Sequence, residues 1–171
     1  MLNILHHYFG TKLLNKIDPE ISHAIALCYL RLLNQFVKKK EIGASILKTQ
    51  IAGMEVPSPI GLAAGFDKNA EVFNATLSLG FGFVEVGTIT PDPQFGNPKP
   101  RLFRLLEEDA LVNKMGFNNK GMLYVSKIAR KPKLGIVGVN LGANAKSIDK
   151  ILDYTNVFDF LAHLFDYVTT V

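Results

Sequence analysis

Three glycine- and asparagine-rich segments carry the residue types best suited to binding a flat, anionic ligand: residues 61–69, 87–91 and 113–121. In the first segment, Gly65 lets the backbone approach a ligand closely, because glycine has no side chain in the way. Lys68 can place a positive charge beside a phosphate or a carboxylate. The first two segments follow short apolar runs, so they predict loops at the ends of strands, where α/β proteins usually bind their ligands.

Amide and hydroxyl side chains accompany these glycines: Thr88, Asn113, Asn118, Asn119 and Asn140. An asparagine side chain both donates and accepts, which suits a ligand with alternating carbonyl and N–H groups. Asn140 is expected to point into the mouth of a barrel. Glycines and asparagines at strand ends often only make turns. Polar groups on successive strand ends of one predicted face nevertheless favour a binding site over that alternative.

The composition is that of an ordinary globular protein, and it argues against several classes of function. The chain has 171 residues, 48% of them hydrophobic, and a formal net charge of +4. Its basic residues gather only at 38–40 and 130–133, without the basic stripe and interleaved aromatics of a nucleic-acid-binding surface. We therefore expect no nucleic-acid partner. The sequence contains neither a phosphate-binding loop of the Gly-x-x-x-x-Gly-Lys-Ser/Thr type nor a dinucleotide fingerprint.

Cysteine and histidine usage narrows the chemistry further. Cys28 is the single cysteine, so it fits a reducing compartment, and we expect it to be a small hydrophobe on a packed helix. The four histidines have no cysteine or carboxylate at metal-ligand spacing, so no metal site is expected. The N-terminus has no secretory signal, and its apolar runs are shorter than the roughly 20 residues of a membrane-spanning helix.

Residues 1–40 are predicted to form two helices joined by a break. Asp18 is placed to cap the second helix, over residues 19–39, and Pro19 suits its first position. This helix is apolar almost all round, so it must be covered by protein or by lipid. Packing against the rest of the domain and contact with a membrane surface are both open at this point.

From residue 59 a strand-then-helix pattern repeats, which predicts an α/β fold with a parallel sheet. The expected strands are residues 59–62, 83–86, 134–141 and 167–171, and the expected helices are residues 68–79, 119–130 and 147–165, the last capped by Ser147. Residues 101–105 and 110–112 are predicted to pair as a hairpin, and residues 43–57 to make a short β excursion. The four units amount to part of a (β/α)8 barrel, which typically needs about 250 residues. We therefore expect another polypeptide segment to cover the sheet edge beside Val171.

Four motifs together resemble one family, the class 2, quinone-linked dihydroorotate dehydrogenases. They are Gly-Leu-Ala-Ala-Gly-Phe-Asp-Lys (61–68), Val-Glu-Val-Gly-Thr-Ile-Thr-Pro (84–91), Gln-Phe-Gly-Asn-Pro-Lys-Pro-Arg-Leu-Phe-Arg-Leu (94–105) and Asn-Lys-Met-Gly-Phe-Asn-Asn-Lys-Gly (113–121). The segment Ile-Asp-Pro-Glu-x-x-His (17–23) is similar to the two-helix extension of class 2 members. The resemblance covers nearly the whole chain.

The resemblance implies a flavoprotein of the (β/α) barrel type that oxidises dihydroorotate to orotate through FMN and passes electrons to a membrane quinone. Residues 1–42 would form a helical extension at the quinone entrance, in peripheral contact with the cytoplasmic face of the inner membrane, and residues 43–171 the N-terminal half of the barrel. The implied FMN-binding residues are Ala64, Gly65, Phe66, Asp67, Lys68, Thr88 and Asn140. The implied substrate-binding residues are Lys68, Asn113, Lys114, Met115, Gly116 and Phe117.

The sequence departs from the family pattern in two places. Ala143 stands where family members commonly have a lysine, and the segment with the catalytic serine base would follow Val171. No catalytic residue is therefore assigned within the chain, and we expect it to be inactive alone, since a base typically contributes about 10²–10⁴-fold. The alternatives are a non-catalytic remnant, a membrane-peripheral binding module, or one half of a split enzyme that a second chain complements.

Overall fold

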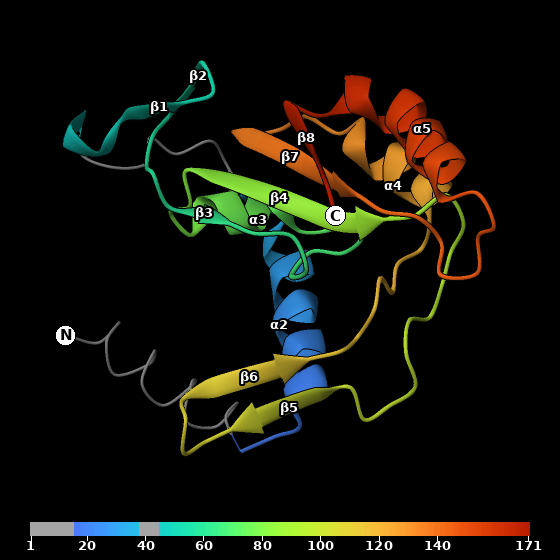
Figure 1. Cartoon of the computed structure of the whole chain (residues 1–171). Helices are drawn as coiled ribbons and strands as arrows, with labels where there is room; N and C mark the ends of the chain where they lie inside the picture. Colours follow the sequence, from blue (N-terminus) through green and yellow to red (C-terminus); the bar gives the residue numbers. More distant parts are fainter. Residues whose placement is uncertain (1–15, 38–44) are drawn as a thin grey trace.

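The computed structural model describes residues 16–37 and 45–171. One N-terminal helix packs against an open parallel sheet, and further helices cover that sheet (Figure 1). Four parallel strands make the sheet, in the order β3 (Gly61–Leu62), β4 (Phe83–Ile89), β7 (Ile136–Leu141) and β8 (Tyr167–Thr170). The register pairs Val84 with Val137 and Asn140 with Thr169. This arrangement confirms the expected partial barrel, because its four strands are parallel and helical connections join them.

One face of the sheet, the outer face, is mainly apolar and supports the core. Val84 and Val86 of β4 and Val139 and Leu141 of β7 are all fully buried. They pack against side chains from the three connecting helices, α3 (Phe73–Ser78), α4 (Met122–Ala129) and α5 (Lys150–Leu161). Alternate residues of a strand point to opposite faces, so the same strands turn their intervening residues to the other side. That other side, the inner face, carries side chains that were predicted to bind a ligand, among them Asn140.

Helix α2 (Pro19–Leu33) begins as predicted, with the Asp18 carboxylate accepting hydrogen bonds from the backbone N–H groups of residues 20 and 21. The prediction that it continues to residue 39 was wrong. It ends at Leu33 because the Asn34 side chain turns to α3, accepting from the Ala75 N–H at 2.9 Å. Leu30 is buried against Val72 and Ala75. The first predicted helix lies almost wholly outside the described residues.

The expectation for Cys28 was also wrong, because its side chain is exposed on α2. Only one face of the helix packs on the barrel. The apolar side chains of Ile21, Ile25, Tyr29 and Leu32 remain about half exposed or more. Within residues 16–37 and 45–171, protein covers one face of α2, and the side chains of the other face are exposed.

The hairpin at residues 101–112 was predicted correctly, and the short β excursion expected at residues 43–57 contains a second hairpin, although a turn divides residues 51–56, which were expected to form one strand. Strands β1 (Thr49–Ile51) and β2 (Met54–Val56) pair across a turn at Ala52 and Gly53, both of which have positive φ. Strands β5 (Leu102–Leu105) and β6 (Ala110–Asn113) pair with Leu102 opposite Asn113. This second hairpin lies beside α2 at the end of the molecule that is lowest in Figure 1.

The helices that follow the strands start later than predicted. Helix α3 begins at Phe73 rather than at residue 68, because the Asp67 carboxylate binds the backbone N–H groups of Glu71 and Val72 and holds the preceding residues in a loop. Helix α4 runs only from residue 122 to 129. The cap of α5 is Asp149 and not Ser147, since the Asp149 carboxylate accepts from the Leu152 N–H at 2.9 Å.

Candidate functional site

A cavity of about 300 Å³ opens at the carboxyl ends of the strands, and nine residues line it. All nine belong to the three segments that the sequence singles out: Ala64, Gly65, Lys68, Thr88, Asn113, Lys114, Met115, Gly116 and Phe117. The structure therefore brings together residues as far apart in the chain as Ala64 and Phe117. Of the other predicted site residues, Asn140 is hydrogen-bonded to Thr88, and Phe66 and Asp67 belong to the first loop.

The first loop is fixed to the end of β4 by its own backbone. The Gly65 N–H donates to the Gly87 carbonyl at 2.8 Å, and the Gly87 N–H donates to the Asp67 carbonyl at 3.0 Å. Gly65 has a φ of 109°, and a Cβ at this position would meet no atom within 4 Å. The backbone is therefore held in a conformation that favours glycine, with space for a ligand above it.

Asp67 does not line the cavity; its side chain is buried behind this loop and binds the backbone that follows it. Its carboxylate is 1% exposed and accepts from the backbone N–H groups of Glu71 and Val72, each at 2.8 Å. Burial raises the pKa of Asp67, and these hydrogen bonds oppose the rise. The position of the side chain favours a role in shaping the loop.

Lys68 is one of the two lysines that line the cavity, the other being Lys114. The Lys68 ammonium group donates to the Gly65 carbonyl, within the same loop. Burial lowers the pKa of Lys68, and the nearby Arg101 guanidinium lowers it further. A bound anion would reverse this effect, because it would favour the charged form of the lysine.

The segment from Asn113 to Phe117 is shaped by its own side chains and by the loop before β5. The Asn113 amide oxygen accepts from the Met115 N–H at 2.8 Å. The Met115 carbonyl accepts from the Asn97 N–H at 2.9 Å, and a Cβ on Gly96 would lie 2.2 Å from that carbonyl oxygen. Glycine at residue 96 is therefore required for this close approach.

A larger cavity of about 550 Å³ adjoins the first and lies between α2 and the β5–β6 hairpin. The two cavities share Gly65, Lys68, Asn113 and Met115 as lining residues. The rest of the larger cavity's lining is mainly apolar, with the leucines 102, 105, 106 and 111. Both volumes fall in the range of small-molecule sites, roughly 300–1,000 Å³.

His23 lies where helix α2 meets the first loop. Its Nε2 is 2.7 Å from the Phe66 carbonyl oxygen, and because a carbonyl only accepts, the N–H must be on Nε2. The ring packs edge-to-face on Phe66, with centroids 5.2 Å apart. Burial lowers the pKa of His23, whereas the hydrogen bond to Phe66 opposes this. The neutral ring thus joins α2 to the loop that carries Lys68.

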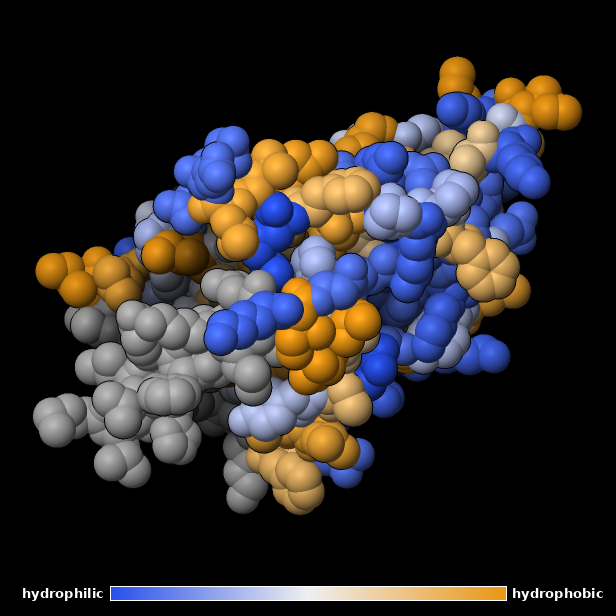
Figure 2. All heavy atoms as spheres, turned by 90° about the horizontal axis from the view of Figure 1, so that it is seen from below, coloured by the Kyte–Doolittle hydropathy of each residue, from blue (hydrophilic) through white to orange (hydrophobic). Residues whose placement is uncertain are grey.

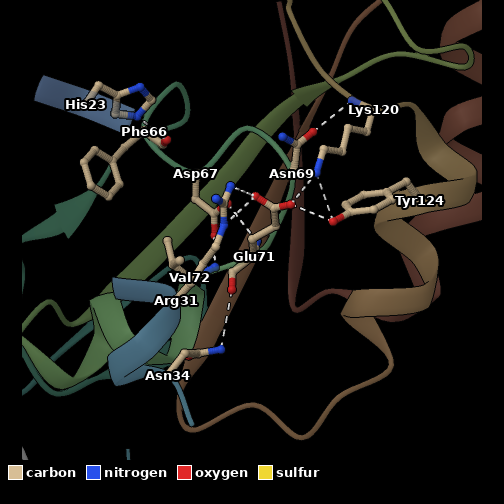
Figure 3. Close-up of polar contacts among 10 residues, drawn as sticks. All are labelled: His23, Arg31, Asn34, Phe66, Asp67, Asn69, Glu71, Val72, Lys120 and Tyr124. Atoms are coloured by element: carbon tan, nitrogen blue, oxygen red, sulfur yellow. Dashed lines mark hydrogen bonds and ion pairs between the residues drawn. The ribbon is translucent and has the colours of Figure 1, made fainter. Parts of the chain in front are cut away.

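Glu71 forms the second connection between α2 and the barrel (Figure 3). Its carboxylate binds Arg31 of α2, Lys120 Nζ at 2.7 Å and the Tyr124 hydroxyl at 2.6 Å. Burial alone would raise the pKa of Glu71, but the hydrogen bonds from Lys120, Tyr124 and Arg31 outweigh it and hold the pKa below its usual value. The Asn69 side chain accepts from the Lys120 N–H at 2.8 Å, so the first and third loops are also tied together.

Arg101 and Glu20 form the third connection. Arg101 is buried and donates to the backbone carbonyls of Phe95 and Asn97 as well as to the Glu20 carboxylate of α2. The sequence alone predicted no role for His23 or Arg101. His23 binds a backbone carbonyl 43 residues away in the chain, and Arg101 binds a carboxylate 81 residues away. Sequence spacing does not reveal such contacts.

Two further properties concern the part of the chain that the structure describes. Residues 16–37 and 45–171 contain no group of three or more histidine, cysteine or acidic side chains arranged to hold a metal ion. Within these same ranges, no helix combines the length and the apolar character needed to span a membrane.

Comparisons with known proteins agree with the resemblance found in the motifs. The model of the dihydroorotate dehydrogenase family matches residues 46–170. The chain is 48% identical over 163 residues to the dihydroorotate dehydrogenase (quinone) of Rhodopseudomonas palustris (strain HaA2), covering 94% of the chain and 44% of the relative. It is 47% identical to the corresponding protein of Mesorhizobium japonicum, covering 94% of the chain and 45% of that relative.

A solved structure gives the same result for the fold. The chain superposes with a TM-score of 0.80 and 36% identity on dihydroorotate dehydrogenase from Eimeria tenella, crystallised in complex with ferulenol. The match covers 90% of the chain and 43% of that structure. The chain therefore spans less than half the length of the relatives it matches.

Proposed function

Because the chain belongs to the dihydroorotate dehydrogenase family, we propose that it acts as the N-terminal part of a quinone-dependent enzyme that oxidises dihydroorotate to orotate. The observation that carries this proposal is the cavity of about 300 Å³, whose nine lining residues all come from the three predicted loops. Residues implied by the family motifs thus meet at one place, at the end of the sheet where (β/α) barrels bind ligands.

FMN is the proposed cofactor, and the residues present suit it. Gly65 and Gly116 expose backbone, Lys68 supplies a positive charge, and Thr88 and Asn113 supply polar groups beside a cavity open enough for a flat ring. Bound FMN would supply the hydride acceptor for the oxidation of dihydroorotate. The proposed FMN contacts are Ala64, Gly65, Phe66, Lys68, Thr88 and Asn140, with Asp67 fixing the loop from below.

The carboxylate of dihydroorotate is proposed to lie near Lys68, with Asn113 and the backbone of residues 114–117 holding its amide groups. Asparagine and backbone groups can satisfy both donors and acceptors of such a ring. These lining residues bind and orient the substrate, and none of them is a serine, cysteine, histidine or carboxylate. We propose that the serine base comes from a complementing C-terminal half, as the family pattern implies.

The larger cavity is proposed to admit the quinone. It has a leucine-rich lining, it lies between α2 and the β5–β6 hairpin, and it adjoins the smaller cavity. Residues 1–42 would bring this entrance to the cytoplasmic face of the inner membrane as a peripheral contact. Support comes from the open face of α2, where Ile21, Ile25, Tyr29 and Leu32 are exposed. Figure 2, a view from the side of the β5–β6 hairpin, shows apolar groups interspersed with polar ones at this end of the molecule.

The proposal for FMN is tested by titrating the purified chain with FMN and following flavin fluorescence. We expect Lys68→Met to weaken binding about tenfold or more, because a buried charge-assisted contact is worth about 1.5–3 kcal/mol. Lys127→Met is the matched control, since Lys127 is exposed on α4, away from the cavity. Equal affinity of the wild-type protein and both variants would contradict the proposed site.

Activity is tested with the C-terminal part of the Rhodopseudomonas palustris relative that lies beyond the matched region. Co-expression should give a flavin-loaded complex that reduces quinone with dihydroorotate, whereas the 171-residue chain alone should not. A chain that turns over without this partner would exclude the complementation proposal. A co-expressed complex that stays inactive, from a chain that still binds liposomes, would favour the membrane-peripheral module.

The membrane contact has its own matched pair of variants. Leu32 of α2 and Leu123 of α4 are exposed to nearly the same extent, 60% and 62%. We expect Leu32→Ser to lower the fraction of chain that floats with anionic phospholipid vesicles and Leu123→Ser to leave it unchanged. Similar losses for both variants would show that flotation does not depend on α2.

A further inference from the structure

Four side chains on the inner face of the sheet form a continuous row of hydrogen bonds. The Thr88 hydroxyl donates to Asn140 Oδ1 at 2.6 Å, and Asn140 Nδ2 donates to the Thr169 hydroxyl at 2.9 Å. The Thr169 hydroxyl then donates to Glu85 Oε1 at 2.9 Å. The row crosses strands β4, β7 and β8 and begins at Thr88 in the wall of the smaller cavity.

Glu85 determines the direction of every bond in this row. An ionised carboxylate only accepts, so Thr169 must donate its single O–H proton to Glu85. The Thr169 oxygen is then free only to accept, which requires the amide nitrogen of Asn140 to face it. The carbonyl oxygen of Asn140 consequently faces Thr88, and Thr88 must donate.

We infer that Glu85 is a positioning residue: through Thr169 and Asn140 it commits the Thr88 proton and leaves the Thr88 oxygen as a hydrogen-bond acceptor for a ligand N–H group. The inference rests on the proposed function only in taking that ligand to be FMN or dihydroorotate. Both have ring N–H groups. With the opposite orientation of the Asn140 amide, Thr88 would donate to the ligand, and the site would favour a carbonyl instead.

Gly138 and the Tyr167 ring lie beside Glu85 on the inner face of the sheet. Glu85 is paired in register with Gly138, and Gly138 with Tyr167. Because Gly138 has no side chain, the Tyr167 ring occupies the space above it, where a Cβ would lie 2.1 Å from the ring. Burial raises the pKa of Tyr167, and the charge of Glu85 raises it further, so Tyr167 stays neutral beside the carboxylate. Charge-assisted hydrogen bonds in such a partly dry site are stronger than neutral ones.

The row is tested directly in the unliganded chain, by NMR of the Asn140 side-chain amide, assigned with Asn140→Asp. Thr169→Val keeps the shape of the side chain and removes the hydroxyl, whereas Thr169→Ser keeps the hydroxyl. We expect Thr169→Val and Glu85→Gln to speed hydrogen exchange at the Asn140 amide by roughly fivefold to tenfold, the loss that one such bond predicts. Thr169→Ser and the exposed control Glu55→Gln should leave the exchange rate and the amide shift unchanged.

FMN titration of the same variants gives the second measurement. If FMN presents an N–H to Thr88, Glu85→Gln should weaken its binding roughly fivefold to tenfold without changing the melting temperature. If the wild-type chain binds no FMN, the proposed function fails. Hydrogen exchange at the Asn140 side-chain amide still tests whether the row of hydrogen bonds exists. If Glu85→Gln does not fold, the Thr169→Val and Thr169→Ser pair decides. Unchanged amide exchange in Thr169→Val overturns the inference.

Discussion

The two faces of the parallel sheet are made from the same strands but differ in almost every physical property. On the outer face, side chains such as Val86, Val139 and Leu141 are fully buried against the helices. On the inner face, the alternate positions hold Glu85 and Asn140, which are polar and mutually connected through Thr169. Because side chains alternate along a strand, one face of the sheet can stabilise the fold by apolar burial while the other face carries groups for binding.

This separation explains why the candidate site tolerates so many glycines and polar groups. Gly87 and Gly138 on the inner face contribute little apolar burial, yet they let other groups approach closely. A Cβ on Gly87 would lie 2.5 Å from the backbone carbonyl oxygen of Asn140. The outer face offsets the loss, because burial of apolar area contributes roughly 25 cal/mol per Å². Mutations on the two faces should consequently differ in size and in the property they change.

The largest effect is expected from truncating the outer face. Leu141→Ala should lower the free energy of unfolding by about 2–5 kcal/mol, because it removes a fully buried side chain and leaves a cavity. Urea denaturation measures this change. Thr170→Ala is the control, since Thr170 is the exposed register partner of Leu141 on β8 and should change stability by less than about 0.5 kcal/mol. Equal losses at both positions would show that burial on the outer face does not set the size of the loss.

A smaller effect is expected from filling the inner face. Gly138→Ala places a Cβ 2.1 Å from the Tyr167 ring, so we expect a loss of about 1–3 kcal/mol from overpacking. The clash is with a side chain, so shortening Tyr167 should relieve it. In urea denaturation, the double variant with Tyr167→Ala should lose less than the sum of the single variants. Additive losses would show that the two residues do not share this space.

The pH dependence of stability tests a polar contact away from both faces of the sheet, between α2 and the first loop. Burial lowers the pKa of His23 in the folded chain, so the unfolded chain binds its proton more readily. Stability should therefore rise with pH from the lowered folded pKa up to the unfolded value of about 6.5. Urea midpoints at pH 5.5 and 7.5 measure this rise.

Two histidine variants identify the group responsible. His23→Gln should reduce the difference between pH 5.5 and 7.5, because glutamine can still donate to the Phe66 carbonyl but does not titrate. His163→Gln, at an exposed histidine, should preserve the difference. A pH dependence that survives in His23→Gln would assign it to other groups.

Much of the sheet could be predicted from the sequence, because its signals are local. The strand at residues 83–86, the hairpin that ends near Asn113 and the cap at Asp18 each depend on neighbouring residues. Helix ends were harder. Asn34 ends α2 by bonding to Ala75, and Asp67 delays α3 through a buried carboxylate, and both effects need tertiary contacts.

The candidate site divides in the same way. The cavity-lining loops were found because their glycines and asparagines cluster along the chain. Glu85 and Thr169 were missed, although both lie on strands and Glu85 stands between Val84 and Val86. A charged residue two positions before Gly87 in an otherwise apolar strand is a signal for the inner face. Its partner on β8 could not be identified without the register.

The smallest effect is expected where α2 meets the barrel, because the charges there are partly solvated. Glu71→Gln removes the charge that binds Arg31 and Lys120, yet both cations are about half exposed and can return to water. Exposed ion pairs contribute about 0–1 kcal/mol each, so we expect a loss of about 1 kcal/mol in urea denaturation. Asp159→Asn, at an exposed carboxylate of α5, is the control and should have no measurable effect. A loss at Glu71 as large as that of Leu141→Ala would mean that this ionic connection, and not the apolar outer face, dominates the stability of the fold.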